Sequence, residues 1–205
     1  MKIAIVHDFL TKMGGAENVL LAMHEAFPDA PIYTLLYDKA GTKNLFEKDC
    51  AIRTSSLQKY PAFIRRHPKF LFGQFSKAIE EFNFSDYDVV ISSSNAFAHG
   101  IITSPATFHL CYCHSPMRYV WDWHAEYLKE NNIGFGFKGI MVRYLIHNIR
   151  LWDKISSTRV DKWLANSKNV QSRIHKYYQK DSTVLYPPVE VTKISQGKRK
   201  PEDFY

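Results

Sequence analysis

The chain contains 205 residues, of which 45% are hydrophobic and 15% aromatic, a composition that supports a packed core and argues against disorder. No apolar run approaches the roughly 18 residues of a membrane-spanning helix, and the opening residues, with Lys2, His7 and Asp8, suit a first β-strand and not a secretion signal, which places the protein in the cytoplasm. The formal net charge of +7 favours an anionic partner, whether nucleic acid, a phosphorylated ligand or an acidic membrane face.

Apolar runs and helical periodicity predict alternating strands and helices. In the first half of the chain, the pattern predicts a strand over Lys2–Phe9, a helix over Ala16–Phe27 that ends at Pro28, and strands over Ile32–Tyr37 and Ala51–Thr54. It also predicts a helical segment over Tyr60–Phe84 that is interrupted near Pro68 and Gly73. The second half predicts strands over Asp88–Ser94 and Phe108–Cys113, a helix over Phe137–Arg159, a strand over Lys162–Asn166, a helix over Asn169–Tyr178 and a strand over Thr183–Tyr186. The long helix carries one apolar stripe, composed of Ile140, Tyr144, Ile146 or His147, Leu151 and Ile155.

This order of elements predicts an α/β, Rossmann-like domain with a mostly parallel sheet of about six or seven strands and helices on both faces. The first strand should lie in the middle of the sheet, since its residues are apolar on both faces. We expect this domain to cover residues 1–190. Residues 191–205 are polar and basic before two terminal aromatic residues, which predicts a linker and the start of another domain.

The first motif at a strand end is Gly14-Gly15, between the first strand and the first helix. Glycines there allow backbone N–H groups to approach an anion beside the positive end of a helix, whereas a tight turn needing only glycine's backbone freedom is the alternative. No third glycine completes a G-x-G-x-x-G fingerprint, which counts against NAD binding.

The second motif runs from Cys113 to Asp122. A strand that ends at His114 presents an imidazole at the edge of the sheet where ligands bind, and we interpret His114 as a functional residue and a candidate for catalysis, although a lone histidine is more often structural. Arg118 can pair with a phosphate, while Tyr119 and Trp121 offer flat surfaces of the kind on which sugars stack.

Two further strand ends carry short polar side chains: Ser94 and Asn95 follow one strand, and Asn166 and Ser167 follow another. These residues suit contacts with a polyhydroxyl ligand, but helix capping alone also explains the second pair. The pair Cys111 and Cys113 has C-x-C spacing without a second cysteine pair, so we expect buried thiols and no metal.

The segment Tyr60–Phe75 mixes cations with aromatic residues. One interpretation is a helix with aromatics in the core and solvated charges; another is an anionic membrane surface contacted by Arg65, Arg66 and Lys69. Single-stranded nucleic acid is a third partner of such a surface, but no motif supports it and we expect none.

Four stretches together resemble one known family: K-I-A-I-V-H-D-F-L-x(3)-G-G-A-E, D-V-V-I-S-S-S, C-Y-C-H-S-P-M-R-Y-V-W-D, and W-L-A-N-S followed by V-L-Y-P-P-V. They are similar to bacterial family 4 glycosyltransferases of the GT-B fold, especially mannosyltransferases of O-antigen and exopolysaccharide assembly. The likeness runs collinearly from Met1 to about Val191.

The resemblance implies the N-terminal, acceptor-side domain of a retaining enzyme that moves a sugar, with mannose as the candidate, from a nucleoside diphosphate sugar to a glycan or lipid-linked acceptor. Gly14 and Gly15 would approach the donor pyrophosphate, and His114 would contact the transferred sugar. Such enzymes need no bound divalent metal, so no cofactor is expected. In the family, a second domain carries most donor contacts and a paired-glutamate E-x(7)-E motif. That domain is not contained in these residues, which implies that this chain alone is inactive.

Two other functions fit the residues without the resemblance. One is a non-enzymatic Rossmann domain that binds a nucleotide, and the other is a basic protein that binds nucleic acid. The membrane-surface interpretation of Tyr60–Phe75 implies a peripheral location at the inner face of the plasma membrane.

Overall fold

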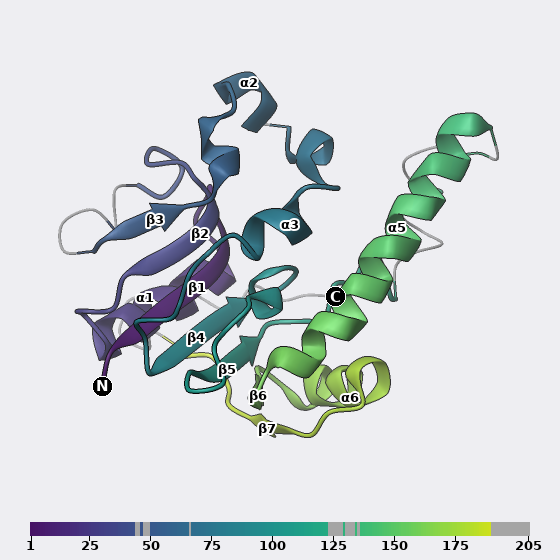
Figure 1. Ribbon diagram of the computed structural model, residues 1–205. Helices are drawn as coiled ribbons and strands as arrows, with labels where there is room; N and C mark the ends of the chain where they lie inside the picture. Colours follow the sequence, from purple (N-terminus) through teal and green to yellow (C-terminus); the bar gives the residue numbers. More distant parts are fainter. Residues whose placement is uncertain are drawn as a thin grey trace, which may run out of the picture.

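The computed structural model describes residues 1–43, 46, 50–65, 67–122, 129, 134 and 136–189. Within these residues, seven strands form one sheet in which all neighbours are parallel (Figure 1). In sheet order they are β3 (Ile52–Thr54), β2 (Ile32–Tyr37), β1 (Ile3–Leu10), β4 (Val89–Ser94), β5 (Phe108–Cys113), β6 (Lys162–Ala165) and β7 (Ser182–Val184). The predicted Rossmann-like α/β class is confirmed.

Strand β1 lies inside the sheet, paired with β2 on one side and β4 on the other, as its continuous apolar run predicted. Its residues Ala4, Ile5 and Val6 have no exposed surface. Strand β7 starts earlier and ends earlier than expected, and residues 191–205 of the expected linker lie outside the described residues.

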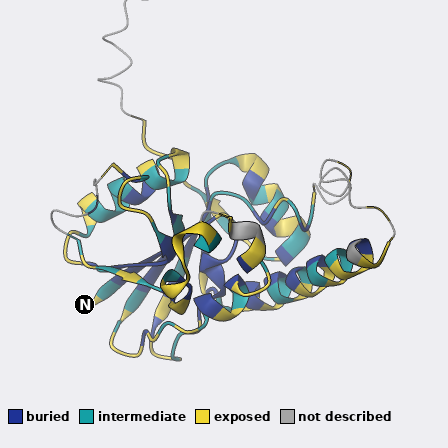
Figure 2. Cartoon of the chain, turned by 90° about the horizontal axis from the view of Figure 1, so that it is seen from above, coloured by how far each residue is buried: buried dark blue, intermediate teal, exposed yellow. Residues whose placement is uncertain are grey.

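Helices cover both faces of the sheet. Their bounds are α1 (Gly15–Ala26), α2 (Ala62–Arg65), α3 (Phe75–Ile79), α5 (Phe137–Ser156) and α6 (Lys168–Tyr178), with short 3-10 turns at η1 (Ser56–Lys59), η2 (Pro68–Leu71), η3 (Ala98–Gly100) and η4 (Ser157–Arg159). On one face, Leu20 of α1 packs with Ile5. On the other face, Phe75 of α3 and Ile149 of α5 join the core, and Ile174 of α6 packs beside them. Figure 2 shows that the buried residues concentrate in the strands and on the inner sides of the helices.

The segment after β3 differs from the single interrupted helix that the sequence predicted. It folds as η1, α2, η2 and α3, because Pro68 occupies the first turn of η2 and starts a new element there. Gly73 then approaches α5 so closely that a Cβ on it would lie 3.3 Å from Cδ1 of Leu145. This segment therefore lies against α5.

Helix α5 turns the predicted apolar stripe outward. Ile140, Tyr144, Leu151 and Ile155 are all exposed, whereas Ile146 is buried. A soluble amphipathic helix usually turns such a stripe to the core, so this exposure departs from the ordinary pattern. No helix in the described part of the chain is long and apolar enough to cross a membrane.

Candidate functional site

The sheet changes direction between β1 and β4. From β1 the chain proceeds to β2 and β3 on one side, and β4 continues through β5 to β7 on the other. Ligands of open α/β sheets bind beyond the carboxyl ends of the strands at such a point. Three segments begin there, namely the Gly14 turn after β1, the turn after Ser94 of β4, and His114 after β5.

Asp8 fixes the turn after β4, and sequence reasoning gave it no such role. Its side chain is fully buried. Oδ2 accepts backbone hydrogen bonds from Asn95 at 2.6 Å and Ala96 at 3.1 Å, and Oδ1 accepts from Phe97 and Ala98 at 2.6 Å each. Burial raises the pKa of Asp8, and the charge of His7 and these backbone donors oppose the rise. One carboxylate thus holds four consecutive amides in place.

A chain of polar side chains crosses the edge from α1 to β5. Oε1 of Glu17 lies 3.7 Å from Nε2 of His7, and Nδ1 of His7 lies 3.0 Å from Oγ of Ser93. The same Oγ lies 2.8 Å from Nε2 of His114. The chain therefore links the first turn of α1 to the residue that we interpret as catalytic, although these residues are about a hundred positions apart.

The environment keeps His114 neutral near pH 7. Burial lowers the pKa of His114 to about 4, with a further lowering by the charge of His7 and an opposing effect of Glu17. The pKa of Glu17 itself is lowered: burial raises it, but hydrogen bonding to His7 outweighs this effect. The row of polar side chains therefore has the carboxylate of Glu17 at one end and the neutral imidazole of His114 at the other.

Hydrogen-bond counting leaves two proton arrangements along this row of side chains. Ser93 has one hydroxyl proton, so it donates to one imidazole and accepts from the other. When Nδ1 of His7 accepts, Ser93 accepts from Nε2–H of His114 and Nδ1 of His114 is a hydrogen-bond acceptor. When Nδ1–H of His7 donates, Ser93 donates to Nε2 of His114 and Nδ1 of the neutral His114 ring carries the proton. The 3.7 Å separation between Nε2 of His7 and Glu17 does not fix which arrangement is present.

The Gly14-Gly15 turn has no conformational need for glycine. Gly14 has φ −158° and ψ −165°, which is extended backbone that any residue adopts, and no described glycine has a positive φ. A Cβ on Gly15 would meet no atom within 4 Å, and one on Gly14 would meet only the flexible side chain of Glu17. No side chain caps α1. The glycines therefore add no side chain of their own at the positive end of α1, where the carboxylate of Glu17 lies.

Asn166 and Ser167 are used within the protein. Nδ2 of Asn166 donates to the backbone oxygen of His114 at 2.9 Å, so Asn166 positions His114. Ser167 is the N-cap of α6, with Oγ accepting from the Val170 N–H at 3.2 Å. Capping, the alternative that the sequence left open, therefore accounts for Ser167.

The polar residues after β4 divide in the same way. Ser94 is buried and its Oγ lies 3.2 Å from Nδ1 of His99, so it supports the core. The side chain of Asn95 is exposed beside the site. Ser92 is likewise buried, with Oγ 2.8 Å from Nε2 of His109. Of the two residues predicted here, only Asn95 is open to a ligand.

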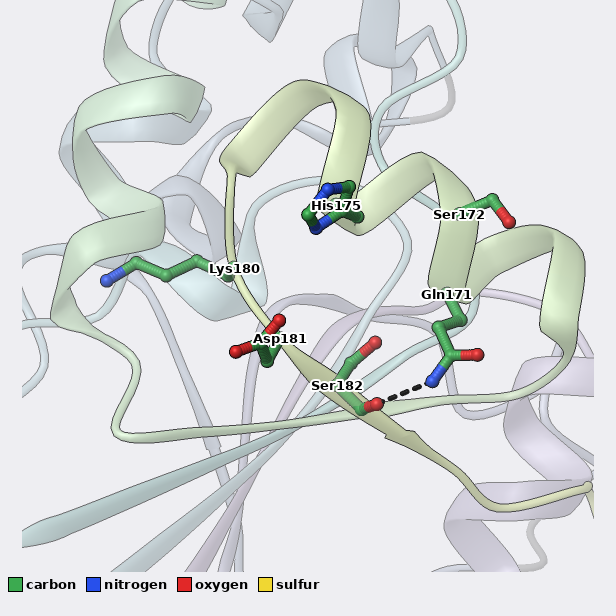
Figure 3. A pocket seen from close by; sticks show the side chains of 6 residues that line it. All are labelled: Gln171, Ser172, His175, Lys180, Asp181 and Ser182. Carbon is green, nitrogen blue, oxygen red and sulfur yellow. Dashed lines mark hydrogen bonds between the residues drawn. The ribbon is translucent and has the colours of Figure 1, made fainter.

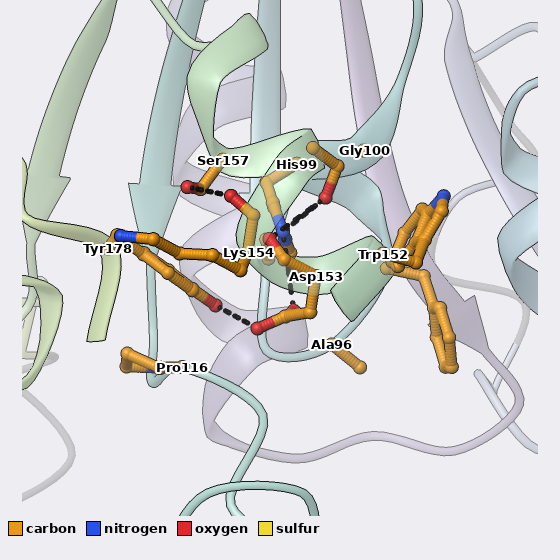
Figure 4. Close-up of polar contacts among 12 residues, drawn as sticks. Ala96, His99, Gly100, Pro116, Trp152, Asp153, Lys154, Ser157 and Tyr178 are labelled. Atoms are coloured by element: carbon orange, nitrogen blue, oxygen red, sulfur yellow. Dashed lines mark hydrogen bonds and ion pairs between the residues drawn. The ribbon is translucent and has the colours of Figure 1, made fainter. Parts of the chain in front are cut away.

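Asp153 of α5 holds the segment that follows His114. Nε1 of Trp121 donates to Oδ2 of Asp153 at 2.7 Å. The Tyr178 hydroxyl donates to the same oxygen at 2.9 Å (Figure 4). Nε2 of His99 lies 3.4 Å from the other oxygen. Burial raises the pKa of Asp153 to about 7, opposed by the hydrogen bonds from Trp121 and Tyr178.

These contacts change the roles expected for the two aromatic residues. The Trp121 ring stacks on Tyr177 with centroids 4.9 Å apart and planes at 16°, so it packs against the protein instead of offering a free platform. Tyr119 is half-buried and packs edge-on against Phe72. Arg118 is exposed in the same turn. Sequence reasoning could not foresee this, because Asp153 and Tyr177 lie far along the chain.

Two other features of the domain are a surface depression and a pair of buried thiols. A shallow depression of about 360 Å³ lies where α6 ends and β7 begins, lined by residues such as His175, Lys180 and Asp181 (Figure 3). Cys111 and Cys113 are buried free thiols, and burial raises the pKa of both. The described residues contain no cluster of three or more metal-binding side chains, and the metal-free site stays a prediction.

The expected membrane-facing cations are placed only in part. Arg65 is half-buried and not exposed as expected, because its Nε donates to the backbone oxygen of Tyr60 at 3.0 Å. Arg66 and the side chain of Lys69 lie outside the described residues. In the same segment Phe63 and Phe70 are 68% and 76% exposed, so its aromatic residues do not all enter the core.

Comparisons with known proteins agree with the fold. The family model for Glycosyltransferase Family 4 matches residues 13–193. Among solved structures, HepE of Anabaena, crystallised in complex with UDP, matches with a TM-score of 0.50 and 14% sequence identity. The match covers 94% of this chain and 45% of that chain, so the present chain spans less than half of HepE. A search of curated proteins finds no match.

Proposed function

The chain belongs to Glycosyltransferase Family 4, and on that premise we propose that it forms the acceptor-side part of a retaining, sugar-nucleotide-dependent glycosyltransferase. The observation that carries this proposal is the glycine-flanked N-terminus of α1, which is linked through Glu17, His7 and Ser93 to His114. HepE, which shares the fold, was crystallised with UDP, and this supports a nucleotide as ligand.

The first turn of α1 is suited to the donor diphosphate. Backbone N–H groups at a helix N-terminus bind phosphate, and Gly14 and Gly15 leave that end free of side-chain bulk. Negative charge grows on the departing diphosphate in the transition state of sugar transfer, so amides fixed in this position lower the barrier. Glu17 must turn away from this end when the diphosphate binds, because both are anionic.

His114 is suited to hold the transferred sugar. Its neutral ring presents Nδ1 to a sugar hydroxyl, while Ser93 fixes the ring through Nε2 and Asn166 fixes its backbone. Asn95 and Arg118 supply the exposed polar groups nearby. No metal or other cofactor is required in this scheme, because helix amides and cations carry the charge.

We propose mannose as the sugar and a glycan or lipid-linked molecule as the acceptor, as in the assembly of bacterial polysaccharides. Because the chain spans less than half of HepE, we propose that a second domain supplies most donor contacts and that residues 1–205 alone transfer no sugar. The acceptor would be met in the cytoplasm at the inner membrane face, where exposed Phe63 and Phe70 contact anionic lipid.

Gly15→Ala tests the donor site without disturbing the fold. An alanine at this open helical position should keep or raise stability, yet its methyl group should weaken binding of a nucleoside diphosphate sugar at least tenfold by calorimetry. Gly136→Ala is the matched control, because a Cβ there also meets no atom within 4 Å and lies at the start of α5. Equal affinity of both variants and the wild type would refute the donor site.

His114→Ala tests the catalytic assignment in an active enzyme that contains this chain. A donor screen with product detection would first identify the sugar nucleotide. The variant should then lose roughly a hundredfold in turnover, about 2.7 kcal/mol of transition-state stabilisation, with little change in unfolding. Unchanged turnover would remove His114 from the mechanism.

A further inference from the structure

The carboxylate of Glu17 has a different neighbour at each of its two oxygens. Oε2 lies beside the backbone of Gly14, so close that a Cβ added to Gly14 would be 2.9 Å from it. Oε1 lies 3.7 Å from Nε2 of His7. The carboxylate therefore stands between the N-terminus of its own helix and the ring of a buried histidine.

The first neighbour makes Glu17 an occupant of the proposed donor site. Glu17 is the third residue of α1, and the first N–H groups of a helix have no acceptor within the helix. A carboxylate at this position reaches back to those groups, as it does in a capping box. Burial raises the pKa of Glu17, but the interaction with His7 and a hydrogen bond from its own backbone N–H outweigh this effect. A charged carboxylate thus lies where a diphosphate oxygen would bind.

The second neighbour lacks a hydrogen bond. His7 is fully buried, and within the described residues its Nε2 has no hydrogen-bond partner. A buried nitrogen without a partner is unfavourable. A movement of the Glu17 side chain by about 1 Å would bring Oε1 to hydrogen-bond distance from this nitrogen. The site therefore offers the carboxylate a second position, at His7.

We propose that a diphosphate bound at α1 displaces the Glu17 carboxylate onto Nε2 of His7, and that this displacement fixes the proton arrangement at His114. The inference rests on the proposed function, since the diphosphate is that of the donor. Two anions repel each other at one helix N-terminus, and His7 provides the nearby group to which Glu17 can turn. Glu17 is thus a positioning residue that acts on His114 through His7 and Ser93.

The effect on His114 follows from hydrogen-bond counting. A carboxylate only accepts, so a close contact with Glu17 requires the proton of His7 on Nε2. Nδ1 of His7 then accepts from the Ser93 hydroxyl, and Ser93 accepts from Nε2–H of His114. This leaves Nδ1 of His114 free to accept a hydrogen bond from a sugar hydroxyl. The opposite arrangement would turn an unprotonated Nε2 of His7 toward the carboxylate, which is repulsive.

Nitrogen NMR of the imidazole rings tests this inference on the 205-residue chain, because it reports which ring nitrogen carries the proton. UDP is the probe, and the two rings are assigned by the signals that His7→Gln and His114→Gln remove. Saturation with UDP should change the ratio of the two His114 tautomers at least about fivefold in favour of Nε2–H, an ordinary strength of coupling between two sites. His7 should change in favour of its own Nε2–H tautomer.

The variant Glu17→Gln separates displacement from simple helix capping. It should bind UDP several-fold more tightly, because a negative charge is removed, yet both rings should lose their response to UDP. A glutamine amide presents either an oxygen or an NH2 group to His7, so it selects neither arrangement. Glu25→Gln is the matched control, because it removes the same charge from an exposed position near the other end of α1. It should bind and respond as the wild type does.

Failure of this inference is distinguishable from failure of the proposed function. Absence of UDP binding in calorimetry, in the wild type and in Glu17→Gln alike, overturns both. UDP that binds but leaves the tautomer ratio unchanged, or changes it equally in Glu17→Gln, overturns the inference alone. Weaker UDP binding by Glu17→Gln also overturns it. A His7 ring protonated on both nitrogens in the complex does so too, because Ser93 would then donate to Nε2 of His114.

Discussion

Replacing Asp8 by asparagine should destabilise the protein by about 4 kcal/mol. The carboxylate accepts four backbone N–H groups, two on each oxygen, in a fully buried position. An asparagine keeps one oxygen, so two N–H groups lose their acceptor and face an NH2 group instead. Each buried donor left unpaired costs about 1–3 kcal/mol, and two of them give the expected loss.

Urea unfolding followed by circular dichroism measures this loss. With a slope of about 2–3 kcal/mol per molar urea, the midpoint should fall by roughly 1.5 M. Asp88→Asn is the control, since its carboxylate is 65% exposed and accepts one backbone bond from Lys2; the expected change is below about 0.5 kcal/mol. A loss under about 1 kcal/mol for Asp8→Asn would refute the view that a charged carboxylate holds this turn.

Three further predictions concern charge. The free energy of unfolding should fall on acidification. The pKa values of His99, His109 and His114 in the folded protein are about 3, 4 and 4, whereas an unfolded histidine binds its proton near 6.5. Urea midpoints that stay constant from pH 7 to pH 4.5 would contradict this prediction. Asp153 has the opposite sign, since its folded pKa of about 7 exceeds the unfolded value of 3.8 and its contribution is lost as pH rises toward 7. Asp153→Asn removes this opposing contribution, so the urea midpoint of the variant should fall more steeply between pH 7 and pH 4.5 than that of the wild type. Equal slopes for the two proteins would contradict the sign. Glu17→Gln should tighten UDP binding several-fold in calorimetry, because it removes a negative charge beside the first turn of α1; weaker binding would show that the carboxylate assists the ligand.

The middle of the sheet was predictable because β1 and β2 are nearly continuous apolar runs, and such runs identify strands buried on both faces. Because parallel strands end at one carboxyl edge, the sequence also predicted that Gly14 and His114 lie at the same edge of the sheet. The groups between them were not predictable, since His7 and Ser93 meet only through strand pairing across 86 residues. The sequence of a buried strand does not indicate which serine hydroxyl forms a hydrogen bond with which histidine ring.

Helix α5 shows a second limit of sequence patterns. Its periodicity predicted the helix, but two apolar sides overlap in the sequence, and periodicity does not say which of them enters the core. The choice depends on Ile149 and Trp152 fitting the face that η3 and α3 present. Trp121 shows the same limit, because its indole looked free until Asp153 and Tyr177 were located beside it.

The pairing of β1 with β4 also sets the order in which the chain can assemble. Asp8 cannot meet its four amides until Ala98 has been synthesised, so the first strand leaves the ribosome long before its partner exists. During that interval β2 can pair with one edge of β1, but the edge that pairs with β4 has no partner and is exposed to other chains. Sheets built from such distant segments close slowly. Production of this protein should therefore respond strongly to chaperone supply and to low temperature, both of which protect β1 while it waits.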